Sequence, residues 1–327
     1  MHIGLAKCAS TTLQRKVFQF ERGYLGTAPQ LSKEENLAMQ LLRCGPFEGR
    51  QFIDRRELQD WSMRVKTLKS ERWPDLNRLI LSQETLSSAN RLSDRPIIKL
   101  LNIMKNKWWL DGRIRVVLIL RNQASRLASS YAQDSNRFFC PNQDSFERWV
   151  KQYLNSKRHL RLLDYITWIN GLTSVVGREN LCILLLEEAD SLGFWNKLSE
   201  FCELEHFDPA LMLGQDRGRE NVRRQSRDSW ALRPLDMNVK AKVATDRWFN
   251  LLWPARAIGE VRSRARQAAV ERLRKFYERK AGKLDLATRG SEIRLCGRIR
   301  NHVDASLGRQ NEELARFLGR DIRHLGY

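Results

Sequence analysis

The sequence lacks the patterns that mark several common kinds of protein. No apolar run approaches the length of a membrane-spanning helix, which argues against a helical membrane protein. The cysteines show no C-x-x-C pair and no zinc-ligand spacing, and we expect free thiols, mostly buried. They are Cys8, Cys44, Cys140, Cys182, Cys202 and Cys296.

Two nucleotide-binding fingerprints are also missing. There is no G-x-x-x-x-G-K-[ST], in which the hydroxyl after the lysine holds magnesium, and no G-x-G-x-x-G. These absences argue against a kinase-like phosphotransferase and a dinucleotide-binding domain. The chain enters a candidate strand within its first residues, which leaves no room for a signal peptide, so we expect a cytoplasmic protein.

What the chain does have, at residues 2–14, is a short apolar strand, a turn with Lys7, and a hydroxyl-rich helix start. Backbone N–H groups at a helix start have no intrahelical partner, so this layout predicts an anion site. Ser10 or Thr11 is a suitable N-cap. Leu13, Val17 and Phe20 have helical spacing, and we expect them to bury one stripe.

The turn resembles the 5′-phosphosulfate loop of the sulfotransferases, P-K-[ST]-G-[ST]-[ST]. Ala6 replaces the usual Pro, and an alanine replaces the usual Gly three residues later. The resemblance implies that this loop holds the 5′ end of 3′-phosphoadenosine 5′-phosphosulfate (PAPS). The implied donor-binding residues are Lys7, Cys8, Ala9, Ser10, Thr11 and Thr12.

A second segment resembles the same family. Residues 115–120 form an apolar run typical of a strand buried on both faces. Residues 121–131 then resemble the 3′-phosphate element L-R-[ND]-P-x-x-R-x-x-S-x-Y, with Gln123 in place of Pro. The resemblance implies that Arg121 and Ser129 hold the 3′-phosphate of PAPS. An arginine fork suits this role because it can bond two phosphate oxygens at once.

The two segments are distant in sequence, but each is a strand that feeds a helix. The carboxyl ends of parallel strands share the ligand-binding edge of an open α/β sheet, so one nucleotide can touch both. The alternative is that each is a strand-turn-helix unit that binds nothing, as occurs in many α/β proteins. Further strands are expected at 79–86 and 181–186, and helices from 145 and at 165–176, 194–201 and 311–319.

This alternation favours an α/β fold with a central, mostly parallel sheet flanked by helices. The resemblance implies a single P-loop-like sulfotransferase domain over 1–327, with a basic, largely helical insertion or lid at 215–300. Residues 217–300 hold 23 Lys or Arg against 9 Asp or Glu, which is +14 of the chain's +20. Arg217 and Arg219 begin a polar loop that can close over the donor, while 255–281 is most simply a solvated helix.

Sulfuryl transfer needs a positive charge near the leaving phosphate and a base for the acceptor hydroxyl. Lys7 and the loop N–H groups meet the first need, and no segment shows a metal-ligand signature, so we expect no metal. For the base we favour Glu84, at the end of an intermediate strand. Glu34 and Glu35 are the alternatives, and each of the three carboxylates can also be an ordinary surface or cap residue.

The resemblance to glycan-type enzymes implies a sulfotransferase that acts on a hydroxyl of a carbohydrate or glycolipid, with PAP as by-product. The basic charge would favour an anionic acceptor and leaves room for peripheral membrane contact. The competing interpretation is a non-catalytic protein that binds nucleic acid or an acidic polysaccharide through its arginine-rich half. Of these polyanions, nucleic acid is the partner we favour less.

Overall fold

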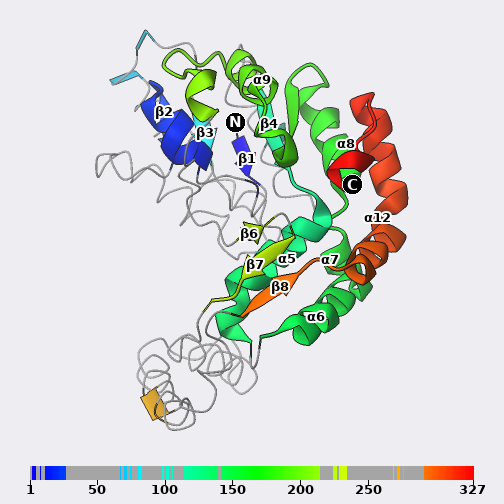
Figure 1. Ribbon diagram of the computed structural model, residues 1–327. Helices are drawn as coiled ribbons and strands as arrows, with labels where there is room; N and C mark the ends of the chain where they lie inside the picture. The colour runs from blue at the N-terminus through cyan, green and yellow to red at the C-terminus, as the bar shows by residue number, and fades with distance from the viewer. Residues whose placement is uncertain are drawn as a thin grey trace, which may run out of the picture. The chain divides into compact units, whose positions relative to one another are not determined.

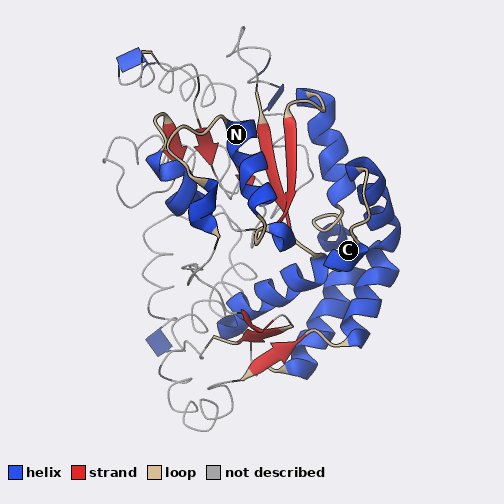
Figure 2. Cartoon of the chain, turned by 45° about the horizontal axis from the view of Figure 1, so that its top comes forward, coloured by secondary structure: helices blue, strands red, loops and turns tan. Residues whose placement is uncertain are grey.

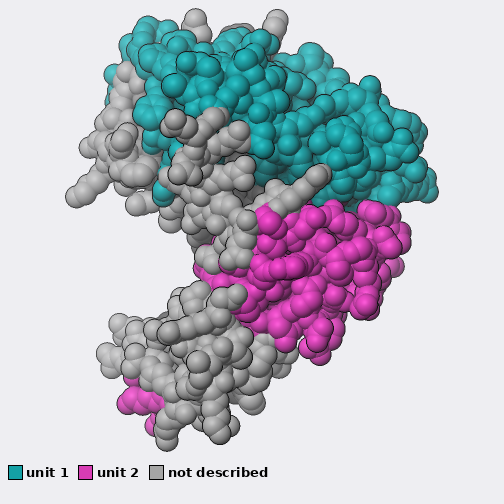
Figure 3. All heavy atoms as spheres, viewed as in Figure 1, with its two compact units in different colours: residues 1–122, 158–220, 307–327 teal, residues 123–157, 221–306 magenta. Residues whose placement is uncertain are grey.

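The computed structural model describes only part of the chain. The described residues are 2–4, 8, 12–26, 67, 70–71, 74–75, 78, 80–82, 98, 101–102, 105, 114–138, 141–213, 224–226, 228–233, 268, 271–272, 275 and 291–327. Contacts divide the chain into two compact units, coloured apart in Figure 3. Unit 1 is Met1–Asn122, Arg158–Glu220 and Leu307–Tyr327, and unit 2 is Gln123–Lys157 and Asn221–Ser306. The sequence analysis treats 1–327 as one domain.

Unit 1 is built on a parallel sheet, which Figures 1 and 2 show as a row of strands. Its five strands have the order β2-β3-β1-β4-β5, and every pair is parallel. The prediction of an α/β fold with a mostly parallel sheet is therefore confirmed. The strands are β1 (His2–Gly4), β2 (Tyr24–Gly26), β3 (Ile80–Ser82), β4 (Val116–Leu120) and β5 (Leu181–Leu185).

The two longest strands are the apolar runs that the sequence predicts. Every residue of β4 and of β5 is buried, as expected for parallel strands covered on both faces. They pair in register from Val116↔Leu181 to Leu120↔Leu185. The strand predicted at 79–86 is described only as β3, because 83–86 lie outside the described residues.

Two helices of unit 1 pack on β5, namely α8 (Tyr165–Val176) and α9 (Leu192–Cys202). The bounds of α8 match the prediction because both ends carry local signals. Asp164 accepts a 3.2 Å bond from the Thr167 N–H, and Gly177 ends the helix at φ 86°. The helix predicted at 194–201 begins earlier, because Ser191 caps it through the Phe194 N–H.

The helix predicted after the Lys7 turn differs in detail. Residues Leu13–Val17 form a π-helix, η1, and Phe18–Phe20 form a 3-10 turn, η2. A π turn holds more residues than an α turn and rotates the buried stripe. Phe18 is therefore buried, and Phe20, predicted to be buried, is 55% exposed. Thr12, just before η1, already has helical backbone angles and makes no side-chain cap bond. Ser10 and Thr11, the predicted N-caps, lie outside the described residues.

Unit 2 combines helices with an antiparallel sheet of order β6-β7-β8. Its strands are β6 (Arg224–Ser226), β7 (Ser229–Ala231) and β8 (Glu292–Arg294), with Trp230 fully buried on β7. The sequence analysis expects 215–300 to be largely helical and does not predict these strands. Each is too short to show an alternating pattern, and β7 and β8 are remote in sequence.

The first two α-helices after β4 in the sequence belong to unit 2. These are α5 (Gln123–Asp134) and α6 (Gln143–Asn155), and α6 begins with a capping box between Asn142 and Ser145. The long helix α12 (Gly297–Leu318) contains the predicted 311–319 segment and runs from unit 2 into unit 1.

The remaining described elements are short, and the basic segment is described at only a few positions. Ala268, Glu271, Arg272 and Lys275, within the predicted 255–281 helix, are helical and exposed. Their spacing places them on one face, as expected for a solvated helix. The short elements are η5 (Ser135–Arg137), α7 (Lys157–Leu160), η6 (Leu186–Glu188), η7 (Pro209–Met212) and η8 (Arg323–Leu325).

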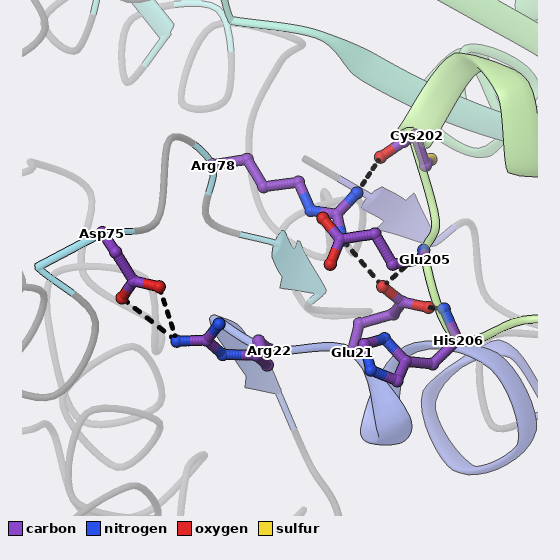
Figure 4. Close-up of polar contacts among 7 residues, drawn as sticks. All are labelled: Glu21, Arg22, Asp75, Arg78, Cys202, Glu205 and His206. Carbon is purple, nitrogen blue, oxygen red and sulfur yellow. Dashed lines mark hydrogen bonds and ion pairs between the residues drawn. The ribbon is translucent and has the colours of Figure 1, made fainter.

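A buried carboxylate, Glu21, joins three segments at the amino-terminal edge of the parallel sheet (Figure 4). Its side chain accepts bonds from Arg78 at 2.7 Å and from the N–H groups of Glu205 at 3.0 Å and His206 at 2.8 Å. Arg78 also donates to the Cys202 carbonyl at 3.2 Å. With this many partners, the charge at Glu21 has a structural role.

Arg115, just before β4, makes a similar contact at the same edge. It donates to the Phe201 carbonyl at 3.1 Å and to the Glu203 carboxylate at 2.6 Å. The carbonyls at the end of α9 therefore receive arginines, as the helix dipole favours. The cations of this edge that the structure describes are paired within the fold.

Candidate functional site

The opposite edge of the sheet contains the topological switch point. From β1 the chain continues to β2 on one side of the sheet, and from β4 it continues to β5 on the other, while β1 and β4 are neighbours. Ligands of open α/β sheets bind outside the carboxyl ends of the strands at such a point. The β1 and β4 ends are in register, with Gly4 opposite Ile119. Arg121 directly follows β4, while residues 5–7, which follow β1 in sequence, lie outside the described residues.

Few of the predicted site residues can be placed. Cys8 and Thr12 are described in unit 1, together with Arg121. Ser129 is described on α5 in unit 2, where it is partly buried. The predicted residues that lie outside the described ones are Lys7, Ala9, Ser10, Thr11, Glu34, Glu35, Glu84, Arg217 and Arg219.

Within unit 1, the chain after β1 and the chain after β4 leave neighbouring strands, because β1 and β4 pair in register up to Gly4 opposite Ile119. Cys8 follows β1 and is completely buried, and Arg121 directly follows β4. Burial lowers the pKa of the Arg121 guanidinium, and the Cys8 thiol acts in the opposite direction. Strand pairing therefore brings one residue of each predicted segment to the same edge of the sheet.

The backbone at Arg121 is held by Tyr165, the first residue of α8. The Tyr165 hydroxyl donates a 2.7 Å hydrogen bond to the Arg121 carbonyl. The Arg121 side chain is partly buried, and the carboxylate of Glu187 opposes the effect of burial on its pKa. Arg121 is thus a cation with its backbone anchored and a carboxylate nearby.

Glu187, on η6 just after β5, uses both carboxylate oxygens. Oε1 accepts the Asn122 backbone N–H at 2.8 Å, and Oε2 accepts the Tyr327 hydroxyl at 3.1 Å. Burial raises the pKa of Glu187, while the bond from Asn122 and the charge of Arg121 act against this rise. Burial also raises the pKa of Tyr327 well above its ordinary value, so its hydroxyl is a stable donor.

A second polar group joins β1, η1 and the end of β3. Ser82, the last residue of β3, bonds the His2 ring at 2.7 Å and accepts from Gln14 at 3.2 Å. Gln14 lies on η1 and also donates to the Ser82 carbonyl at 3.3 Å. Burial lowers the pKa of His2 to about 3, so its imidazole is neutral. These bonds fix the helix after the loop to the sheet, and π-helical turns often occur at functional sites.

Glu187, Tyr165 and Tyr327 are not among the site residues predicted from the sequence. Glu187 carried a usable signal, because it follows a buried strand in the way that Arg121 does. Tyr327 carried none, since it is 140 residues from the carboxylate that it contacts. Gln14 and Ser82 were likewise unmarked by any local pattern.

Among the described residues, no cluster of three or more His, Cys, Asp or Glu side chains is arranged to hold a metal ion. Within the same residues, no helix combines the length and the apolar character needed to cross a membrane. The cysteines that the structure describes, Cys8, Cys182, Cys202 and Cys296, are free thiols.

Comparison with protein-family models, with curated proteins and with solved structures finds no match to this chain.

Proposed function

We propose that this chain is a sulfotransferase that moves a sulfuryl group from PAPS to a hydroxyl of a carbohydrate or glycolipid. The observation that carries the proposal is the parallel pairing of β1 with β4 at the switch point of the sheet, which brings the segments of Cys8 and Arg121 to one edge. Each belongs to a segment that resembles a phosphate-binding element of the sulfotransferases. A ligand with phosphates at both ends accounts for both segments at one edge.

The described residues fit one end of such a donor. Arg121 is partly buried at the carboxyl edge of the sheet, where a charge-assisted bond to phosphate is stronger than in water. The carboxylate of Glu187 lies near Arg121, but it already accepts two other hydrogen bonds. It is therefore not a substitute for a phosphate that bonds two nitrogens of the guanidinium. Ser129 would be the second 3′-phosphate ligand, and Lys7, with residues 8–12, would hold the 5′ end.

When bound, PAPS would supply a sulfuryl group whose S–O bond to the 5′-phosphate breaks as a bond to the acceptor oxygen forms. Lys7 and the N–H groups of its loop would stabilise the negative charge that develops on the released phosphate oxygen. Glu84 would take the proton of the acceptor hydroxyl, with Glu35 and Glu34 as the alternative bases. Arg217 and Arg219 would cover the donor from the basic loop.

The acceptor class rests on the resemblance to glycan-type enzymes. The +14 of residues 217–300 favours acceptors that are themselves anionic, since a basic surface attracts them. The same charge also suits a non-catalytic polyanion binder, and the experiment below separates the two.

Calorimetric titration with adenosine 3′,5′-bisphosphate, without magnesium, tests the proposal. We expect binding by the wild type and a loss of about a hundredfold in Arg121→Ala, as for a charge-assisted bidentate contact. Arg115→Ala is the matched control, because Arg115 lies at the other end of the same strand and should leave nucleotide affinity unchanged. Failure of the wild type to bind, together with steep salt dependence toward polyanions, would favour the polyanion binder.

Turnover is tested by incubating the protein with labelled donor and a panel of saccharides and glycolipids. Label transfer to at least one acceptor, lost in Arg121→Ala, is the expected result. Nucleotide binding without transfer to any member of a broad panel would argue against the enzyme.

A further inference from the structure

We infer that Glu187 and Tyr327 are positioning residues, which orient Arg121 and moderate its charge for the donor's phosphate. This inference rests on the proposed function and extends it to side chains that belong to neither phosphate-binding segment. The resemblance to sulfotransferases, which supports the proposed function, does not involve these two residues.

The hydrogen bonds fix the peptide that carries Arg121 from both sides. Tyr165 donates to the Arg121 carbonyl, and Glu187 accepts the N–H of the next residue, Asn122. Fixing two successive backbone groups determines the direction in which the Arg121 side chain leaves the strand. Glu187 is itself fixed, because its other oxygen accepts the Tyr327 hydroxyl.

The register of the sheet explains why Glu187 reaches this peptide. Leu120 and Leu185 are paired at the ends of β4 and β5, so the residues that follow each strand emerge side by side. Glu187 is therefore placed by strand pairing, and Tyr327 closes the arrangement from the C-terminal segment, where it is buried.

Glu187 is better suited to positioning than to proton transfer. Both oxygens already accept hydrogen bonds, which leaves the carboxylate poorly available to an acceptor hydroxyl. Its negative charge keeps Arg121 ionised in spite of burial, but the same charge repels a phosphate. The charge should therefore weaken donor binding while the hydrogen bonds strengthen it, and the two effects can be measured separately.

The groups that face this carboxylate are Arg121 and Tyr327, and those around Arg121 are Cys8 and Tyr165. A phosphate bound to Arg121 would add negative charge beside Glu187 and favour its protonated form. Donor binding should therefore be linked to proton uptake at Glu187.

The test is titration of adenosine 3′,5′-bisphosphate into the wild type and four variants at several pH values. Glu187→Gln removes the charge and keeps an oxygen to accept the Asn122 N–H, while its amide NH2 would donate to the Tyr327 hydroxyl. Glu187→Ala removes the charge and both contacts. Tyr327→Phe removes one bond only. Glu188→Gln is the control, because Glu188 lies on the same turn but pairs with Arg320.

We expect Glu187→Gln to bind about tenfold more tightly than the wild type near pH 8. That ratio should fall toward one as the pH is lowered and the wild-type carboxyl takes up a proton. The titration of the nucleotide's own phosphates is common to both proteins and cancels in the ratio. Glu187→Ala should bind about tenfold more weakly than Glu187→Gln, and Tyr327→Phe about threefold more weakly than the wild type.

A purely structural role would lower thermal stability in all these variants but leave the pH-dependent ratio flat. If the wild type binds, Arg121→Ala does not, and Glu187→Gln matches the wild type at every pH, the inference is overturned and the proposed function stands. If the wild type does not bind the nucleotide, the proposed function and the inference are both overturned. Glu187→Gln carries the test even if Glu187→Ala does not fold.

Discussion

Arg78 donates a 2.7 Å hydrogen bond to Glu21, whose side chain is fully buried, at the sheet edge opposite the candidate site. The pair joins the turn before β2 to the residues just before β3. Further hydrogen bonds join Glu21 and Arg78 to the end of α9 and the residues after it (Figure 4). The charges of Glu21 and Arg78 have partners within the fold, so this edge of the sheet has a structural role. The catalytic chemistry that we propose is confined to the other edge.

Replacement of Glu21 should therefore cost stability rather than nucleotide binding. Glu21→Ala leaves two N–H groups without their acceptor and Arg78 without its buried carboxylate partner, and we expect a loss of about 3 kcal/mol in unfolding free energy. Asp75→Ala is the control, because its pair with Arg22 is exposed and should contribute little to stability. Urea unfolding measures both. Equal losses in the two variants would contradict the structural role of Glu21.

The burial of His2 should make the stability of the folded chain depend on pH. In the folded chain burial lowers its pKa to about 3, whereas the unfolded chain should protonate near 6.5. Below that pH the unfolded state binds a proton that the folded state does not, so stability is lost as pH falls, by about 1.4 kcal/mol per pH unit. The comparison of wild type with His2→Gln isolates this effect.

Urea unfolding of both proteins should therefore show the wild type losing about 2 kcal/mol more than His2→Gln between pH 6.5 and about pH 5. Parallel pH profiles for the two proteins would show that His2 is solvated in the folded chain, contrary to its burial and its bond to Ser82.

Replacement by alanine should change stability in opposite directions at two glycines. Gly177 ends α8 at φ +86°, and an added Cβ would meet the Glu179 side chain, so Gly177→Ala should cost about 1 kcal/mol or more. Gly308 lies inside α12 with open space around it, so Gly308→Ala should stabilise by about 0.5–1 kcal/mol. Thermal unfolding of each variant measures the effects. Stabilisation by Gly177→Ala would contradict the positive φ.

Lys7 should matter more for turnover than for product binding. If it stabilises charge that develops only during transfer, Lys7→Ala should lower kcat by about a hundredfold, with a smaller effect on adenosine 3′,5′-bisphosphate affinity. Lys16→Ala is the control, since that lysine lies on η1 beyond the loop. An equal loss of affinity and kcat would show that Lys7 serves ground-state binding alone.

Several elements could be predicted because their signals are local. The runs that became β4 and β5 are apolar throughout, and a strand buried on both faces needs no alternation. The bounds of α8 followed from a cap at Asp164 and a glycine at 177. Around residue 13 the local pattern was misleading, because a π-helical turn changed which side chains face the core.

The candidate site was predictable only in part. Arg121 could be identified from its place after a buried strand, and its place at the same sheet edge as the segment of Cys8 was expected from the rule that parallel strands share one ligand edge. The strands of unit 2 were not predictable, because β7 pairs with β8 across a long intervening segment and neither shows a pattern alone. Lys7, Glu84, Glu35, Arg217 and Arg219 remain predictions.

The sequence by itself determined the parallel sheet and the helices that cover it, while the two anion-binding turns remain predictions. The sheet and the helices depend on the apolar character and spacing of residues near one another in the chain. Only the tertiary structure decided the order of the strands and the partners of Arg121. Glu187 lies 65 residues from the Asn122 N–H that it accepts, and Tyr327 lies 140 residues from Glu187. These bonds form only when the sheet is paired and the C-terminal segment is in place. Contacts of this kind leave no local signal, because the side chains that make them are selected by the fold as a whole.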